Sequence, residues 1–213
     1  MCSRTIQRYG AWLLALLAVA TVSPAAALAP PASGSPPSAV AGGADGPGAT
    51  GQVFLTVDEA LELAFPDCQI ERRRVFLTEE QHARAKKLAD VEIDSAIVRP
   101  YVATKDGKLV GTAYFDAHRV RTLKETVMFV AAPDNRIARV EVLAFAEPIE
   151  YMPRGTWYAQ FLGRVLDEEL NLKRGIKNVT GATLTARATT EAARRVLALH
   201  QVVNEAKGAA RAR

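Results

Sequence analysis

The chain has 213 residues, and its formal net charge of +4 at pH 7 is too small a surplus to indicate a nucleic-acid-binding protein. The sequence contains no CxxCH haem-attachment motif, no phosphate-binding P-loop and no GxGxxG fingerprint. Its three histidines lack the paired spacing of metal ligands, so we expect no zinc or iron site.

Residues 1–27 are predicted to be a cleavable export signal. Arg4 and Arg8 precede an uncharged apolar run, residues 11–22, which is too short to cross a membrane as a stable helix, and the small residues SPAAALA follow it. Cys2 lies before the apolar run, so it is not placed to be the lipid-bearing cysteine of a lipoprotein. We expect a periplasmic or otherwise extracytoplasmic bacterial protein, with an uncleaved membrane anchor as the alternative.

The rest of the chain divides by composition into a linker, one domain and a tail. Residues 28–52 are dominated by Pro, Gly, Ala and Ser and offer little to bury, which is typical of a tether. Residues 53–203 suit one compact domain, and residues 204–213 are predicted to be a disordered tail. After signal cleavage Cys68 is the remaining cysteine, so packing must hold the domain together without an internal disulfide.

Two short surface helices are predicted at the start of the domain. Thr56 is a suitable N-cap for TVDEALELAFPD, which has acids in its first turn, where the helix dipole favours negative charge, and Pro66 at its end. TEEQHARAKKLADV repeats this arrangement from Thr78, with acids at its start and lysines near its end.

From Ile97 onward the hydrophobic period becomes that of strands. AIVRPYVATKDGKLVGTAYFD alternates around Asp106 and Gly107, a pair that accepts the positive φ angles of a tight hairpin turn. ETVMFVAAPDNRIARVEVLAF gives a second pair of strands around PDNR, where Pro133 presets φ for a type I turn. We therefore predict a four-stranded antiparallel meander sheet.

Two further helices are predicted in the C-terminal part. The first carries an aromatic and apolar stripe at Trp157, Phe161, Val165 and Leu166. The second is long, and one side should pack against the sheet because apolar residues recur every three or four positions, at Leu184, Ala188, Ala192, Val196, Leu199 and Val203. The predicted fold class is α+β: a four-stranded antiparallel meander packed by N-terminal helices and a long C-terminal helix.

The start of the long helix differs from the starts of the first two. A helix N-terminus exposes unpaired N–H groups and a partial positive charge, yet NVTGATLTARATTEAARRVL supplies no acid before Glu191. Gly181 would let the backbone approach an anion closely, and a helix N-terminus is a natural phosphate seat. Basic residues surround it, at Lys173, Arg174, Lys177 and Arg187. The alternative is an ordinary threonine-capped helix with Arg187 paired to Glu191.

TGATLT, residues 180–185, followed by an alanine-rich helix, resembles the signature of the FMN-binding domain family. That family includes the covalently flavinylated subunits of sodium-pumping NADH:quinone reductases and Rnf complexes. Its motif is Ser/Thr-Gly-Ala-Thr, and a flavin transferase joins the phosphate of FMN to the hydroxyl of the last threonine. The resemblance implies a phosphoester at Thr183, with further cofactor contacts from Thr180, Gly181, Ala182, Leu184 and Thr185.

The resemblance covers roughly residues 97–199. The stretch from GTAYFD to AEPIEY, followed by WYAQFLGR, is similar to the family's order of hairpins, a glutamate-containing turn and a Gln-Phe-x-Gly helix. The resemblance implies that Glu147, Tyr151 and Trp157 lie near the isoalloxazine ring. His118, whose charge responds to small changes in its environment, is a further candidate neighbour of the reduced flavin. The family requires neither metal ligands nor a catalytic triad.

Lys177 stands three positions before the first hydroxyl residue of the motif, where the family usually has an acid. Either the transferase tolerates a lysine there, or FMN binds without the covalent link. The expected function is electron transfer rather than stand-alone enzymatic catalysis, because the flavin supplies the redox chemistry. The expected partners are a flavin transferase and membrane or periplasmic redox proteins, and an uncleaved signal or a docking partner would hold the chain at the membrane.

Two alternative functions remain open from the sequence. One is an exported non-redox module that binds a small ligand or a protein, in which the motif is merely a capped helix. The other is an FMN reductase that acts directly on a small substrate.

Overall fold

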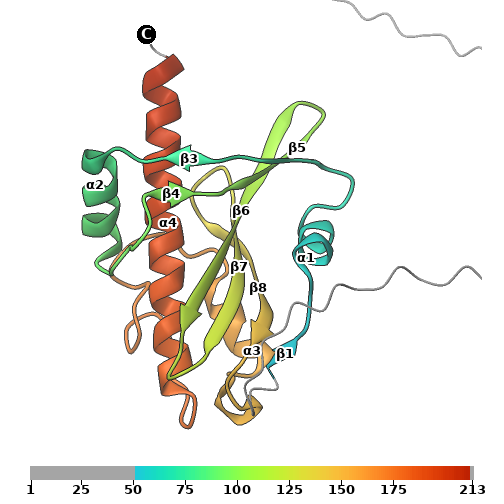
Figure 1. Cartoon of the computed structure of the whole chain (residues 1–213), viewed down its shortest axis with the longest axis vertical. Coiled ribbons are helices and arrows are strands. Elements are labelled where there is room, and N and C mark those ends of the chain that lie inside the picture. Colours follow the sequence, from blue (N-terminus) through green and yellow to red (C-terminus); the bar gives the residue numbers. More distant parts are fainter. Residues whose placement is uncertain (1–50, 212–213) are drawn as a thin grey trace, which may run out of the picture. The chain divides into compact units, whose positions relative to one another are not determined.

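The computed structural model describes the backbone of residues 51–211 and the side chains as far as residue 206. The expected signal, residues 1–27, and most of the expected linker lie outside the described residues, as do residues 212–213. The described part is an α+β unit in which an antiparallel sheet is packed by helices, so the predicted fold class is confirmed (Figure 1). Within it, no helix is long and apolar enough to span a membrane.

Both predicted N-terminal helices are present with their predicted caps. α1 (Val57–Ala64) begins after Thr56, whose hydroxyl accepts from the N–H of Glu59 while the Glu59 carboxylate accepts from the N–H of Thr56. α2 (Glu79–Ala89) begins after Thr78, which forms the same reciprocal pair with Gln81. Each capping box satisfies N–H groups that the helix itself leaves unpaired.

The predicted meander is confirmed as the centre of the sheet. Its four strands are β5 (Tyr101–Lys105), β6 (Lys108–Arg119), β7 (Lys124–Ala131) and β8 (Ile137–Phe145), paired antiparallel in sequence order. The β5–β6 turn has φ of 52° at Asp106 and 73° at Gly107, the two positive values expected for a type I′ hairpin.

The prediction of four strands was wrong, because the sheet has six. β1 (Gln52–Val53), which begins at the last residue of the expected linker, pairs with β8, and β2 (Gln69–Arg72) pairs with β5. The order is therefore β1-β8-β7-β6-β5-β2. β3 (Val75–Phe76) and β4 (Ile97–Val98) form a separate two-stranded sheet. Segments this short contain too few residues to show the alternation of a strand. β1 and β2 pair with the free edges of the meander, whereas β3 and β4 pair with each other.

The predicted aromatic helix is much shorter than expected. It consists of α3 (Gly155–Tyr158) and a 3-10 turn over Ala159–Phe161, preceded by another 3-10 turn over Ile149–Tyr151. The chain leaves the helix because Gly163, with φ of 75°, donates its N–H to the carbonyl of Ile137, while the N–H of Ile137 donates to Arg164. Val165 and Leu166 therefore lie in a loop.

The long C-terminal helix is present as α4 (Thr183–Arg211). It continues through residues 204–211, which we expected to be a disordered tail. Of the predicted inward positions, Ala192, Val196 and Val203 are buried, but Leu184 is 45% exposed. The inward place in that turn is taken by Thr185 and Ala186, so the buried stripe starts one residue later than predicted.

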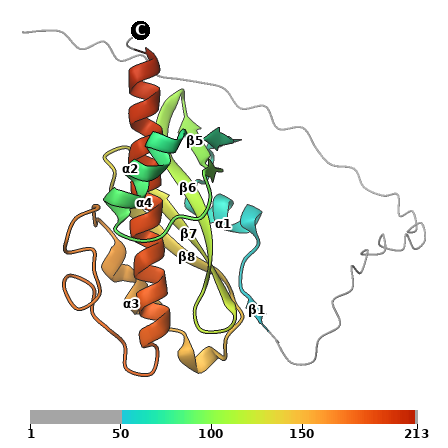
Figure 2. The ribbon, with the colours of Figure 1, turned by 60° about the vertical axis from the view of Figure 1, so that its left-hand side comes forward.

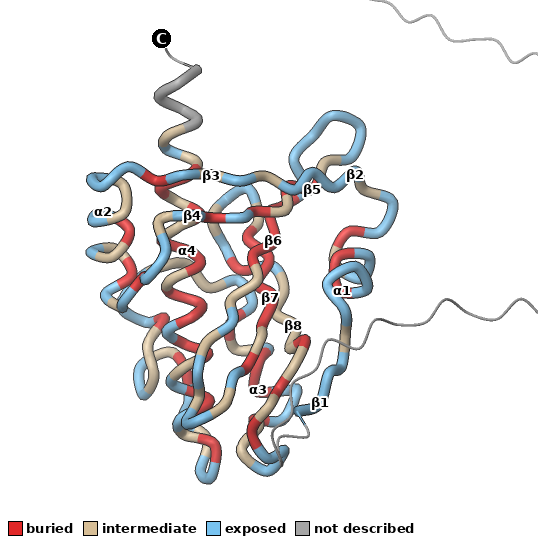
Figure 3. Tube along the Cα trace, viewed as in Figure 1, coloured by how far each residue is buried: buried red, intermediate tan, exposed pale blue. Residues whose placement is uncertain are grey.

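The sheet separates two apolar cores. α4, with α2 beside it, covers one face, and α1 covers part of the other (Figures 1 and 2). The larger core lies on the α4 side and contains Phe129, Phe161 and Leu197, each with no exposed surface. The smaller one joins α1 to the opposite face through Leu61 and Phe65. Burial is concentrated in the central strands and along α4 (Figure 3).

Candidate functional site

Residues 180–183 form the turn that leads directly into α4. Gly181 has φ of 87°, a conformation that glycine adopts at little cost. A Cβ placed on Gly181 would meet nothing within 4 Å, and the N–H of Ala182 closes the turn by donating to the carbonyl of Val179. The positive φ thus favours glycine at this position, and the space beside its Cα is open.

The start of α4 lacks the caps that α1 and α2 possess. The residue before it is Ala182, whose side chain holds no acceptor, and its first turn contains no acidic residue. The N–H groups of a first helical turn have no partners within the helix. This N-terminus therefore presents hydrogen-bond donors and a partial positive charge to an anion, as the sequence indicated.

Two threonine hydroxyls at this helix start have different roles. The half-buried Thr183 donates its hydroxyl to the carbonyl of Val179 at 3.2 Å and accepts from the Asn178 side-chain amide at 3.3 Å. The fully buried Thr185 donates to the carbonyl of Tyr151 at 2.6 Å, which ties α4 to the preceding 3-10 turn. Of the two, Thr183 is the hydroxyl that solvent can reach.

One cavity lies at this helix start, and a second cavity shares Arg121 and Tyr151 with it. The smaller, of about 200 Å³, is lined by residues 181–185 together with Val120, Arg121 and Tyr151. The larger, of about 640 Å³, is lined by the β6–β7 turn and by residues 145–149, and again by Arg121 and Tyr151. The Arg121 guanidinium stands 5.2 Å from the centre of the Tyr151 ring. Tyr151 thus lies beside residues 181–185, and Arg121 is a cation there that sequence reasoning missed.

Glu147 lines the larger cavity and also holds the β6–β7 turn that forms part of its wall. Its Oε1 accepts from the backbone N–H groups of Arg121, Thr122 and Leu123, at 3.1, 2.7 and 2.8 Å. These bonds, that from Leu123 foremost, hold the pKa of Glu147 below its usual value. The carboxylate therefore fixes the β6–β7 turn, which carries Arg121.

Trp157 lines neither cavity but holds the segment that leads into the motif. Its Nε1 donates to the carbonyl of Lys177 at 2.6 Å, and the N–H of Lys177 donates to Oε1 of Gln160 at 2.9 Å. Two residues of the WYAQFLGR stretch, Trp157 and Gln160, thus bind the backbone carbonyl and N–H of Lys177. Sequence reasoning missed the part played by Gln160, although its place in the Gln-Phe-x-Gly pattern was a usable signal.

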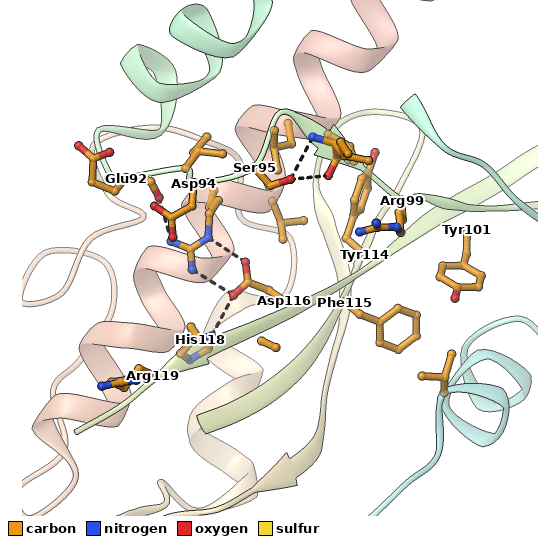
Figure 4. A pocket seen from close by; sticks show the side chains of 18 of the residues that line it. Glu92, Asp94, Ser95, Arg99, Tyr101, Tyr114, Phe115, Asp116, His118 and Arg119 are labelled. Carbon is orange, nitrogen blue, oxygen red and sulfur yellow. Dashed lines mark hydrogen bonds and ion pairs between the residues drawn. The ribbon is translucent and has the colours of Figure 1, made fainter. Parts of the chain in front are cut away.

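His118 lies apart from the helix start, against a third cavity of about 580 Å³ (Figure 4). Its Nδ1 is 3.0 Å from Oδ1 of Asp116 and its Nε2 is 2.9 Å from Oε2 of Glu125. Asp116 is held in turn by a bidentate pair with Arg195 of α4, at 2.8 and 3.0 Å. The structure therefore places His118 in a charged cluster between the sheet and α4.

Glu125 is the most deeply buried acid of this cluster, with no exposed surface. The Tyr158 hydroxyl donates to its Oε1 at 3.1 Å, and the Thr189 hydroxyl lies 2.9 Å from its Oε2 and 2.9 Å from the carbonyl of Thr185. Sequence reasoning missed this residue. The signal was its place in ETVMFV, where alternation puts it on the same face as Val127 and Phe129.

The cluster shifts the pKa values of its members in opposite directions. Burial by itself lowers the pKa of His118, but the hydrogen bonds and charges of Asp116 and Glu125 outweigh it and raise the pKa to about 9. Burial would raise the pKa of Asp116, but His118 and Arg195 together lower it to about 2. His118 is thus an imidazolium at neutral pH, and together with Arg195 it balances the carboxylates of Asp116 and Glu125.

Comparisons of this chain with protein-family models, with curated proteins and with solved structures found no significant match. Among residues 51–211, no group of three or more His, Cys, Asp or Glu side chains is arranged to hold a metal ion.

Proposed function

We propose that this protein is an exported flavoprotein that carries FMN, joined through its phosphate to Thr183, and relays electrons between redox partner proteins. The observation that carries the proposal is the uncapped start of α4, where the reachable hydroxyl of Thr183 and the open turn at Gly181 face one cavity. The likeness of TGATLT to the flavinylation signature supports the same residue.

The groups at this site fit a phosphate. The first-turn N–H groups of α4 are donors without helical partners, and Arg121 adds a fixed positive charge on the opposite wall. Esterification of Thr183 would remove the hydroxyl proton that now bonds the carbonyl of Val179, a partly buried hydrogen bond of 3.2 Å. The lining of the smaller cavity thus supplies positive charge and donors and contains no acid that would repel the phosphate.

The residues near the flavin ring are proposed from the two cavities. Tyr151 and Arg121 line both, and Glu147 positions the turn that carries Arg121. Trp157 acts as a positioning residue, because its indole N–H holds the carbonyl of Lys177 just before the motif. When bound, FMN would supply the exchange of one or two electrons, and these residues would orient it and limit its exposure to water.

Intact mass spectrometry after co-expression with a flavin transferase tests the proposal. We expect one FMN-sized addition on the tryptic peptide 178–187, NVTGATLTAR, and a yellow colour that survives denaturation. Thr183→Ser keeps a hydroxyl at the same place and should retain the addition. Thr183→Ala should fold normally but lose the addition completely.

Two results would contradict the proposal. A colourless wild-type protein of unmodified mass, made with an active transferase, would leave a non-redox binding module as the better assignment. An addition that persists in Thr183→Ala would instead refute the attachment site.

A further inference from the structure

Half of β6 is an open sheet edge. β5 pairs with β6 only as far as Tyr101 opposite Ala113, whereas β7 pairs with β6 along residues 112–119. In the part of the chain that the structure describes, no strand pairs with residues 114–119 on the β5 side. Since a strand directs alternate N–H and C=O groups to each side, this stretch presents a row of backbone donors and acceptors.

The cavity of about 580 Å³ runs along this edge. All six residues from 114 to 119 line it, although successive side chains of a strand point to opposite faces of the sheet. A cavity on one face would be lined by alternate residues only. Asp116 and His118 reach it from the α4 face, whereas Phe115 lies on the other side of the strand (Figure 4). The cavity therefore opens onto the backbone edge itself.

The opposite wall of this slot is the segment 92–99. The residues before β5 could in principle have extended this strand along β6. Pro100, directly before β5, has no N–H to donate to such a ladder. The carbonyl of Pro100 accepts instead from the N–H of Arg73, and Ile97 and Val98 pair with β3. The gap beside β6 therefore follows from the path of the chain. The extended segment 92–99 forms its opposite side.

The charges that face the slot are predominantly positive. Arg72 stacks on the Tyr101 ring at one end, Arg99 lies nearby, and Arg119 stands at the other end. Two of the three acids in the lining already hold a cation: Glu92 binds Lys86, and Asp116 binds Arg195. Asp94, the third acid, contributes to the raised pKa of Arg195 on α4, whereas Arg72, Arg99 and Arg119 add three positive charges to the lining.

We propose that an extended acidic segment of a partner protein binds in this slot by adding a strand to β6 along residues 114–119. Main-chain hydrogen bonds to the open edge would supply affinity, and acidic side chains paired with Arg72, Arg99 and Arg119 would supply selectivity. A strand of six residues spans about 20 Å, the length of the open edge. This docking surface is separate from the start of α4, so it does not depend on the flavin.

Fluorescence polarisation with labelled hexapeptides tests the proposal. The probe is Glu-Val-Glu-Val-Glu-Val with blocked ends, compared at low salt with Lys-Val-Lys-Val-Lys-Val. The acidic peptide should bind about tenfold or more tightly than the basic one. Hydrogen exchange should slow at those alternate amides of residues 114–119 that face away from β7. N-methylation of alternate residues on the edge that faces β6 should abolish binding, because it removes the ladder donors while keeping the charges.

Protein variants separate the charge contribution from the fold. Arg99→Glu with Arg119→Glu, both at exposed residues, should weaken binding about fivefold to tenfold. Lys87→Glu with Lys108→Glu makes the same charge change at exposed residues that do not line the slot, and should leave binding nearly unchanged. Absence of binding, equal binding of the N-methylated or the lysine peptide, or protection elsewhere would overturn the proposal.

Discussion

At the scale of single residues, the charged cluster around His118 shows how neutrality is kept inside the fold. Asp116 and Glu125 bring two carboxylates beneath α4, and Arg195 with His118 brings two cations. A buried charge without a partner is costly, so each carboxylate is matched by a hydrogen-bonded cation. The balance holds only while His118 is protonated.

The stability of the protein should therefore depend on His118 at alkaline pH. The pKa of His118 is raised in the folded state, so its contribution is complete below the unfolded value of 6.5 and is lost as the pH rises through about 9. The expected loss of unfolding free energy across this window is at most about 3 kcal/mol. Urea unfolding at a series of pH values between 6 and 9.5 measures it.

Two histidine variants control this measurement. His118→Gln should be less stable at neutral pH and should lose the decline between pH 6.5 and 9. His82→Gln removes a histidine that bonds the carbonyl of Ile93 outside the cluster, and should keep the decline. A wild-type protein whose unfolding free energy is flat over this window would contradict the assignment of charge to His118.

At the scale of elements, local chemistry decides where helices and hairpins begin. The two threonine capping boxes and the turn at Asp106 and Gly107 each rest on residues at most three positions apart. The longer aromatic helix fails for a non-local reason: residues 163 and 164 bond to Ile137 at the start of β8. A helical period is thus overridden when the backbone finds partners in the sheet.

The turn at Gly107 gives a matched pair of glycine variants. An added Cβ meets nothing within 4 Å at either Gly107 or Gly155, but only Gly107 of the two has a positive φ. Gly107→Ala should therefore lower the free energy of unfolding by about 1 kcal/mol through backbone strain alone. Gly155→Ala should change it by less than about 0.5 kcal/mol. Equal effects in thermal or urea unfolding would show that backbone conformation is not the cause.

At the scale of the whole molecule, α4 joins the structural core to the candidate site. Its inward face is apolar along most of its length, and its first turn borders the cavity at Thr183. Rigid packing of the later turns therefore holds the motif in place. The polar residues on the same face, Thr185 and Thr189, anchor the helix to Tyr151 and Glu125.

Two leucines of α4, one buried and one exposed, allow the contribution of core packing to stability to be measured. Leu197 has no exposed surface, so Leu197→Ala should cost about 2 to 5 kcal/mol of unfolding free energy by leaving a cavity. Leu184 is 45% exposed at the mouth of the site, and Leu184→Ala should change stability by less than about 0.5 kcal/mol. The sequence pattern had placed Leu184 inward, so a large loss for Leu184→Ala would favour that pattern over the structure.

Features that depend on near neighbours in the chain could be predicted from the sequence. The helix starts at Thr56 and Thr78 and the two hairpins of the meander follow from capping, turn and periodicity rules acting over a few residues. The candidate site stays a prediction. The helix start without an acid points to Thr183 and Gly181, and the resemblance of TGATLT to the flavinylation signature implies the roles of Thr183, Glu147 and Tyr151.

Only the tertiary structure decided what chain segments far apart in sequence do together. In the structure β1 and β2 lie at the sheet edges, His118 lies in the charged cluster rather than beside Thr183, and Arg121 lines the cavity at the helix start. The tertiary structure also left residues 114–119 of β6 without a paired strand on the β5 side, among the residues that the structure describes. The physical reason is that local rules describe one segment at a time, whereas edge pairing, charge neutralisation and cavities depend on which segments meet when the core closes.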